Sequence, residues 1–193
     1  MTTDLSTEQG QALLGLARKT LEERLGREKD TPSSSAPLQG DESLREKKGT
    51  FVTLTIKGRL RGCIGSLEAR ETILDGVKRN ALNAAFHDPR FNALSPDELD
   101  EVHIEISVLS QPMPLPYTDS ADLLAKLTPG QDGVIITYGS ASATFLPQVW
   151  DQLQEKEEFL SHLCAKAGLP SDAWKNKKLD VSIYQVQSFE EHE

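Results

Sequence analysis

Residues 50–65 read TFVTLTIKGRLRGCIG, and this stretch decides the fold of the first half of the chain. Residues 50–56 are mostly β-branched or apolar, which is typical of a strand. Lys57 and Gly58 form a plausible tight turn, and residues 60–64 resume the β pattern. The stretch therefore predicts an antiparallel β-hairpin.

The second strand of this hairpin carries the hexapeptide LRGCIG at residues 60–65. Residues two apart in a strand share a face, so we expect the Arg61 guanidinium and the Cys63 sulfur to point the same way. Leu60 and Ile64 are then expected on the opposite face, which suits a core. This pattern places a cation beside a thiol, where the cation favours the reactive thiolate.

Two glycines flank the thiol in this hexapeptide. Gly62 and Gly65 leave the backbone near Cys63 uncovered, so a ligand or another chain is able to approach closely. Their backbone N–H groups are also able to bind negative charge. We therefore take Gly62 and Gly65 as candidate ligand-binding residues for a small anion.

The rest of the chain alternates helical and β patterns. A capping box at Ser6 and Gln9 starts a helix that Gly26 ends. Residues 28–48 are polar and rich in Ser and Pro, which indicates a surface connector. Further helices are predicted over residues 71–86, 119–127, 147–153 and 157–167, and further strands over 102–109, 134–138, 143–145 and 181–189. Hairpin-type strands mixed with helices predict an α+β fold, with a mainly antiparallel sheet flanked by helices.

Composition narrows the class of protein. The chain has 193 residues, enough for one domain with a sizeable core, and 37% hydrophobic against 26% charged residues is an ordinary soluble balance. Its net charge of −9 and pI near 5.0 disfavour nucleic acid or an anionic membrane as a partner. No stretch approaches the roughly 18 apolar residues of a membrane span.

The N-terminus and the cysteines indicate a cytoplasmic protein. Residues 1–4 carry no basic region followed by an apolar run, so no signal peptide is predicted. Cys63 and Cys164 lie far apart in sequence and make no disulfide framework. The chain has no C-x-x-C or H-E-x-x-H motif, and we expect neither a metal nor a cofactor.

Five motifs occur in order along the chain, and together they point to a family. They are GTFVTL at residues 49–54, LRGCIG at 60–65, DPRF at 88–91, FLPQVW at 145–150 and KAGLP at 166–170. This set closely resembles the AMMECR-domain family, the protein-A component of the AmmeMemoRadiSam system. The resemblance covers roughly residues 5–190.

The resemblance implies a single AMMECR-type domain over residues 1–193, with a larger sheet-and-helix part and a smaller lobe. It implies a cytoplasmic protein whose possible partners are a Memo-like protein and a radical S-adenosylmethionine enzyme. In that family the hexapeptide is the suspected active or interaction site, and no reaction is assigned to it. His87 departs from the family pattern, which more usually has a basic residue such as arginine there.

The candidate residues each have an alternative reading. Cys63 is a candidate nucleophile, ligand or redox thiol, or else a small buried residue in a tight turn. Arg61 is able to clamp a carboxylate or phosphate, or else to pair with an acidic side chain. Arg90 is open between joining this cluster and pairing with Asp88. Nothing in the sequence places a histidine base beside Cys63.

Three functions follow from these residues. The first is an enzyme, or an enzyme component, in which Arg61 holds a small anionic ligand and Cys63 reacts. The second is a non-catalytic adaptor that binds Memo-like or radical S-adenosylmethionine proteins through the same surface. The third, a thiol redox sensor, lacks a resolving cysteine in the sequence, since Cys164 is expected to be buried and inert.

Overall fold

The predicted hairpin forms one side of a four-stranded sheet. In the computed structural model, which describes residues 4–27 and 40–191, β1 (Thr50–Ile56) pairs antiparallel with β2 (Arg59–Ser66). The turn residues Lys57 and Gly58 both have positive φ, 51° and 72°. Two consecutive positive φ values match the right-handed twist of a tight hairpin, so the predicted turn is confirmed.

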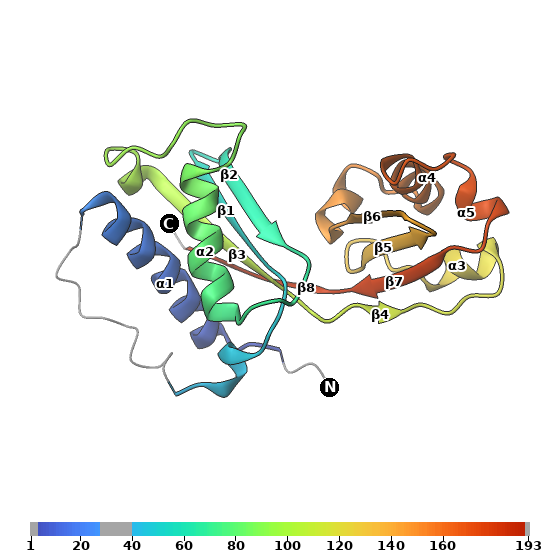
Figure 1. Ribbon diagram of the computed structural model, residues 1–193, viewed down its shortest axis with the longest axis horizontal. Helices are drawn as coiled ribbons and strands as arrows, with labels where there is room; N and C mark the ends of the chain where they lie inside the picture. Colours follow the sequence, from blue (N-terminus) through green and yellow to red (C-terminus); the bar gives the residue numbers. More distant parts are fainter. Residues whose placement is uncertain (1–3, 28–39, 192–193) are drawn as a thin grey trace. The chain divides into compact units, whose positions relative to one another are not determined.

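The chain divides into two units, which are described separately (Figure 1). Unit 1 consists of Met1–Leu109 and Gln187–Glu193, and unit 2 is Ser110–Val186. The sheet of unit 1 has the strand order β2-β1-β3-β8, with β3 at Val102–Leu109 and β8 at Val186–Glu190. β2 is therefore an edge strand.

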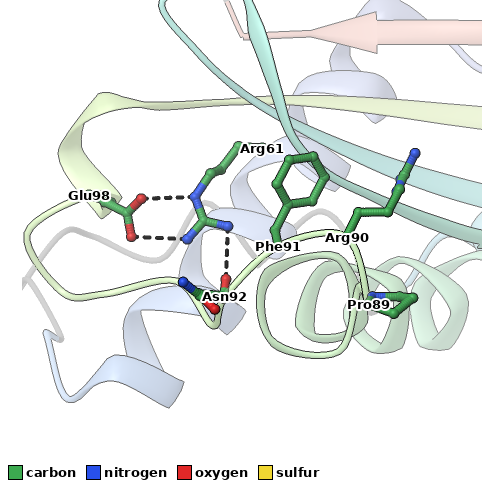
Figure 2. A pocket seen from close by; sticks show the side chains of 6 residues that line it. All are labelled: Arg61, Pro89, Arg90, Phe91, Asn92 and Glu98. Atoms are coloured by element: carbon green, nitrogen blue, oxygen red, sulfur yellow. Dashed lines mark hydrogen bonds and ion pairs between the residues drawn. The ribbon is translucent and has the colours of Figure 1, made fainter.

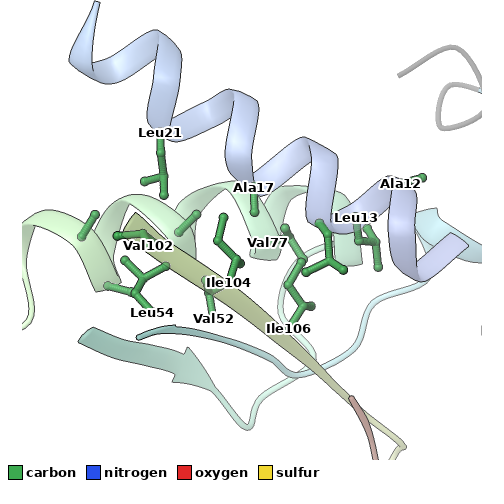
Figure 3. Close-up of a cluster of buried hydrophobic side chains, with 14 of the residues drawn as sticks. Ala12, Leu13, Ala17, Leu21, Val52, Leu54, Val77, Val102, Ile104 and Ile106 are labelled. Carbon is green, nitrogen blue, oxygen red and sulfur yellow. The ribbon is translucent and has the colours of Figure 1, made fainter. Parts of the chain in front are cut away.

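Two helices cover one face of the unit 1 sheet: α1 (Thr7–Leu25) and α2 (Ile73–Phe86) (Figures 1 and 3). The capping box at Ser6 starts α1, and Gly26 ends it in the left-handed conformation at φ 66°. Burial of each large aliphatic side chain in this core contributes about 2 kcal/mol. The core side chains include Leu13, Ala17, Leu21, Val52, Leu54, Val77, Ile104 and Ile106.

Unit 2 repeats the plan of a sheet with helices on one side. Its strand order is β4-β7-β5-β6, and the main core helix is α4 (Lys156–Lys166). Trp150 stacks on Phe159 with ring centroids 3.6 Å apart, and its indole nitrogen donates to the Asp132 carbonyl. The other elements of unit 2 are β4 (Met113–Pro114), α3 (Ser120–Lys126), β5 (Gly133–Tyr138), β6 (Ala141–Phe145), η3 (Pro147–Asp151), α5 (Ala173–Asn176) and β7 (Asp180–Tyr184).

The predicted α+β class with antiparallel sheets is confirmed, and several segments differ in detail. The single strand expected at residues 181–189 is two strands, because the backbone of Gln185 bonds Ser110 and leaves the ladder between them. The helix expected from Pro147 is a short 3-10 helix, η3. α5 was not predicted from the sequence.

The connector expected at residues 28–48 is only partly described. Residues 28–39 lie outside the described part of the chain. After them, η1 (Glu42–Arg45) is a turn of 3-10 helix capped by the Asp41 side chain. Another 3-10 turn, η2 (Leu99–Glu101), directly precedes β3. Among the described residues, no helix is both long enough and apolar enough to span a membrane.

Candidate functional site

A β-bulge interrupts the hexapeptide and decides where its side chains point. Leu54 pairs with Gly62, but the next residue of β1, Thr55, pairs with Leu60. Arg61 therefore has no partner on β1. One extra residue in a strand shifts the alternation of faces for everything beyond it.

The bulge corrects the expected position of Leu60. Its partner Thr55 lies on the face of the sheet turned away from α1 and α2, which we call the outer face; Thr53 and Cys63 lie there too. Leu60 is accordingly 44% exposed, and the expectation that it faces the core is wrong. Ile64 lies beyond the bulge on the other side and packs against the core as expected.

Arg61 is held by a carboxylate on the loop that follows α2 (Figure 2). Its Nε and Nη2 donate to the two carboxylate oxygens of Glu98 at 2.8 and 3.1 Å, and Nη1 donates to the Asn92 carbonyl at 3.0 Å. This bidentate pair lowers the pKa of Glu98 from 4.5 to about 2. The guanidinium of Arg61 thus faces residues 92–98. Of its two predicted roles, it forms the ion pair with an acidic side chain.

Cys63 lies on the outer face, and the residue as a whole is partly exposed. Thr53, directly opposite on β1, donates its hydroxyl to the sulfur at 3.3 Å. Cys164 is fully buried in the core of unit 2, and burial raises the pKa of its thiol. The two thiols of the chain therefore have opposite environments.

Asp88 and Arg90 bind the backbone of Cys63. Asp88 Oδ2 accepts the Cys63 N–H at 2.9 Å, and Arg90 Nη2 donates to the Cys63 carbonyl at 3.2 Å. Arg90 also donates to both carboxylate oxygens of Asp88, from Nε at 2.9 Å and from Nη2 at 2.7 Å. The guanidinium beside Cys63 is therefore that of Arg90.

The electrostatics of this pair follow from its contacts. Hydrogen bonds from Arg90 hold the pKa of the Asp88 carboxyl well below its usual range. The pKa of Arg90 is raised, first by Asp88 and to a smaller extent by the Cys63 sulfur. Both groups are therefore charged at neutral pH, and a fixed cation stands next to the thiol.

The two glycines of the hexapeptide are positions of close packing. A Cβ added to Gly62 would lie 2.1 Å from the Ala84 carbonyl oxygen of α2, and one added to Gly65 would lie 2.2 Å from the Phe51 ring. Protein atoms thus occupy the space that a side chain would fill at either residue. Close packing by α2 and by the Phe51 ring accounts for glycine at both positions, and ligand binding by their backbone stays a prediction.

A hollow of about 440 Å³ adjoins the Arg61 and Arg90 side chains (Figure 2). Phe91 lies between them, with its ring centroid 6.0 Å from Arg61 Cζ and 5.5 Å from Arg90 Cζ. Asn92, Pro89 and Glu98 complete the lining. Arg90 is the more available cation, because its side chain is 52% exposed against 14% for Arg61.

The structure also shows which residues lie elsewhere and which were missed. His103 pairs with Thr55 on β1, and in the described part of the chain no cluster of three His, Cys, Asp or Glu is arranged to hold a metal. Glu98 was missed because its partner Arg61 is 37 residues away. The clamp by Asp88 was partly visible in sequence, since Asp-Pro-Arg predicts a turn in which the two charges pair.

Comparisons with known proteins agree with the motifs. The AMMECR1 family model matches residues 14–189. A Thermofilum pendens protein is 41% identical over 97% of this chain and 92% of its own length, and a Methanothermobacter thermautotrophicus protein is 39% identical over 97% and 96%. The crystal structure of an uncharacterized Pyrococcus horikoshii protein is similar with a TM-score of 0.79 and 34% identity, covering 97% of this chain and 94% of that one.

Proposed function

The chain belongs to the AMMECR1 family, and from that premise we propose that it is an enzyme, or an enzyme component, that binds a small anionic ligand beside a reactive Cys63 thiol. The observation that carries the proposal is the set of contacts that Cys63 makes. Cys63 is a partly exposed residue whose sulfur accepts the Thr53 hydroxyl, while Arg90 lies against the same residue.

The residues have distinct roles in this proposal. Cys63 is the reactive thiol, and Arg90 is the main anion-binding group because half of its side chain is exposed. Arg61 lines the neighbouring hollow, where its charge is paired with Glu98. Gly62 and Gly65 support the site by allowing α2 and Phe51 to pack closely around Cys63. A free thiol requires a reducing compartment, for which we propose the cytoplasm.

Protection of Cys63 by inorganic phosphate tests the proposal. Peptide mass spectrometry would follow alkylation of Cys63 by iodoacetamide with and without phosphate. We expect phosphate to slow the reaction in the wild-type protein but not in Arg90→Gln. Arg79→Gln, which changes a half-exposed arginine on α2 paired with Glu71, is the matched control and should keep the protection.

Two outcomes would count against the proposal. Either Cys63 reacts no faster in the folded protein than a buried thiol does, or phosphate protects the wild type and Arg90→Gln equally. Native mass spectrometry of gently purified protein adds a direct readout. An anionic ligand that is retained by the wild type and lost from Arg90→Gln would identify the substrate class.

One observation favours the adaptor as a second candidate. Leu60 is an exposed apolar side chain within the hexapeptide, on the same outer face as Cys63. Protein A of the AmmeMemoRadiSam system would then bind a Memo-like or radical S-adenosylmethionine partner through this face. Leu60→Asp should abolish such a complex in a pull-down, whereas Tyr138→Asp, at an exposed aromatic of unit 2, should leave it intact. Equal binding by the wild type, Leu60→Asp and Tyr138→Asp would contradict the adaptor function.

A further inference from the structure

The edge of β2 is closed by an ion pair where another sheet would have a strand. The N–H and carbonyl of an edge residue that point away from the sheet need partners. At Cys63 the partners are Asp88 Oδ2, which accepts, and Arg90 Nη2, which donates. One carboxylate and one guanidinium thus replace the acceptor and the donor of a neighbouring strand.

Asp88 is the centre of this arrangement. Its side chain is only 1% exposed, and its carboxylate accepts four hydrogen bonds. One comes from the Cys63 backbone and the other three come from Arg90, namely its backbone N–H at 3.1 Å, Nε and Nη2. A planar guanidinium bound through two nitrogens has little rotational freedom.

This clamp leaves one part of Arg90 available. Within residues 4–27 and 40–191, the side-chain hydrogen bonds of Arg90 use Nε and Nη2 and none uses Nη1, and the side chain is 52% exposed. The same carboxylate that fixes the Arg90 fork also fixes the peptide that carries the thiol. Asp88 therefore links the Arg90 guanidinium to the peptide of the thiol, in addition to the direct bond from Arg90 Nη2 to the Cys63 carbonyl.

We propose that Asp88 is the positioning residue of the thiol site, holding the Cys63 peptide and the Arg90 guanidinium so that one anion contacts both Arg90 Nη1 and the Cys63 sulfur. This inference rests on the proposed function of Cys63 and adds a residue to it. Asp88 itself does not touch the ligand, because its oxygens are already occupied by Cys63 and Arg90.

A positioning role and simple Coulomb attraction predict opposite effects of removing the Asp88 charge on the reaction of Cys63 with an anionic reagent. Asp88→Asn makes the site more positive by one charge, which by Coulomb attraction alone would favour an anionic reagent. If Asp88 positions Arg90, the same change releases the guanidinium and weakens the attraction at the sulfur. The sign of the effect therefore separates the two explanations.

The experiment compares two alkylating reagents that differ in charge. The measured quantity is the rate of Cys63 carboxymethylation by anionic iodoacetate divided by its rate with neutral iodoacetamide. We expect this ratio to fall about threefold in Arg90→Gln, and by a similar factor in Asp88→Asn. Asp122→Asn, which removes a paired carboxylate in unit 2, is the matched control and should leave the ratio unchanged.

A second variant decides the matter if Asp88→Asn does not fold. Arg90→Lys keeps the positive charge but is unable to form the two-pronged bond to Asp88. Positioning predicts a ratio as low as that of Arg90→Gln. A wild-type ratio in folded Asp88→Asn or in Arg90→Lys, or a raised ratio in Asp88→Asn, would overturn the inference.

The failure of the proposed function has its own signature. A wild-type ratio no higher than that of free N-acetylcysteine, and unchanged by Arg90→Gln, would remove the anion site altogether. A wild-type ratio that depends on Arg90 but not on Asp88 would leave the anion site in place and overturn the positioning role alone.

Discussion

Each of the two units contains one cysteine, and the two environments are opposite. Cys63 in unit 1 lies on the sheet face turned away from the helices, partly exposed and bonded by Thr53. Cys164 in unit 2 lies on the core side of α4 and is fully buried. Both units are antiparallel sheets with helices on one side, so the fold plan alone does not decide whether a cysteine is exposed. The face on which each cysteine lies decides it.

The largest expected effect is the difference in reactivity between these thiols. We expect iodoacetamide to modify Cys63 at least about a thousandfold faster than Cys164, because a buried thiol reacts only after local opening. Peptide mass spectrometry over a time course measures both rates in one sample. In denaturant the two rates should converge, and similar rates in the folded protein would contradict the comparison.

A second comparison concerns one close-packed glycine from each sheet. Gly62→Ala should destabilise the protein by about 3 kcal/mol, because its Cβ meets a backbone oxygen of α2 that is unable to move. Gly133→Ala in unit 2 meets the side-chain ring of Tyr184 at 2.3 Å and should cost about half as much. Urea unfolding of both variants tests which of them loses more free energy of unfolding. Equal losses would show that β2 and α2 separate easily.

Acid should weaken unit 1 through Glu98. Its pKa is lowered from 4.5 to about 2 in the folded protein, first by Arg61. A lowered carboxyl pKa stabilises the fold above the unfolded value, and the stabilisation disappears as the pH falls from about 4.5 towards 2.

The size of this effect is about 1 kcal/mol, because Glu98 is 35% exposed and solvent screens the pair. Glu98→Gln should therefore be less stable than the wild type near neutral pH and lose less stability on acidification. Thermal unfolding of both proteins across this pH range measures the difference. If the stability of the two proteins fell in parallel with pH, the ion pair of Glu98 with Arg61 would not stabilise the fold.

The smallest expected effect comes from the hydroxyl next to the sulfur. Thr53→Val removes the donor to Cys63 Sγ and should slow alkylation of Cys63 about twofold, since hydrogen bonds to sulfur are weak. Thr137→Val makes the same change on the sheet of unit 2, where the hydroxyl contacts Ser142, and should not alter the rate. An equal change in both variants would point to a general effect on stability.

Much of the fold could be predicted because its signals are local. The capping box at Ser6, the turn at Lys57 and Gly58 and the helical period over residues 71–86 each depend on neighbours in sequence, and each was confirmed. The final strand was misjudged as one continuous element because alternation runs through Gln185 without interruption. Only its partner Ser110, 75 residues away, shows where the ladder breaks.

The hexapeptide shows the same limit within the candidate site. Alternation with a period of two predicted that Arg61 and Cys63 share a face, and that Leu60 opposes them. A bulge is defined by the count of residues on two paired strands, so one strand read alone does not reveal it. Long-range partners then directed Arg61 to Glu98 and brought Arg90 to Cys63.

By itself, the sequence determined the family, the α+β class, the hairpin and the position of a thiol on its second strand, because these depend on composition, periodicity and ordered motifs. Only the tertiary structure decided which cation lies beside that thiol. The two arginines are chemically identical, and their roles differ because Glu98 draws one guanidinium to the loop while Asp88 holds the other at the edge of β2.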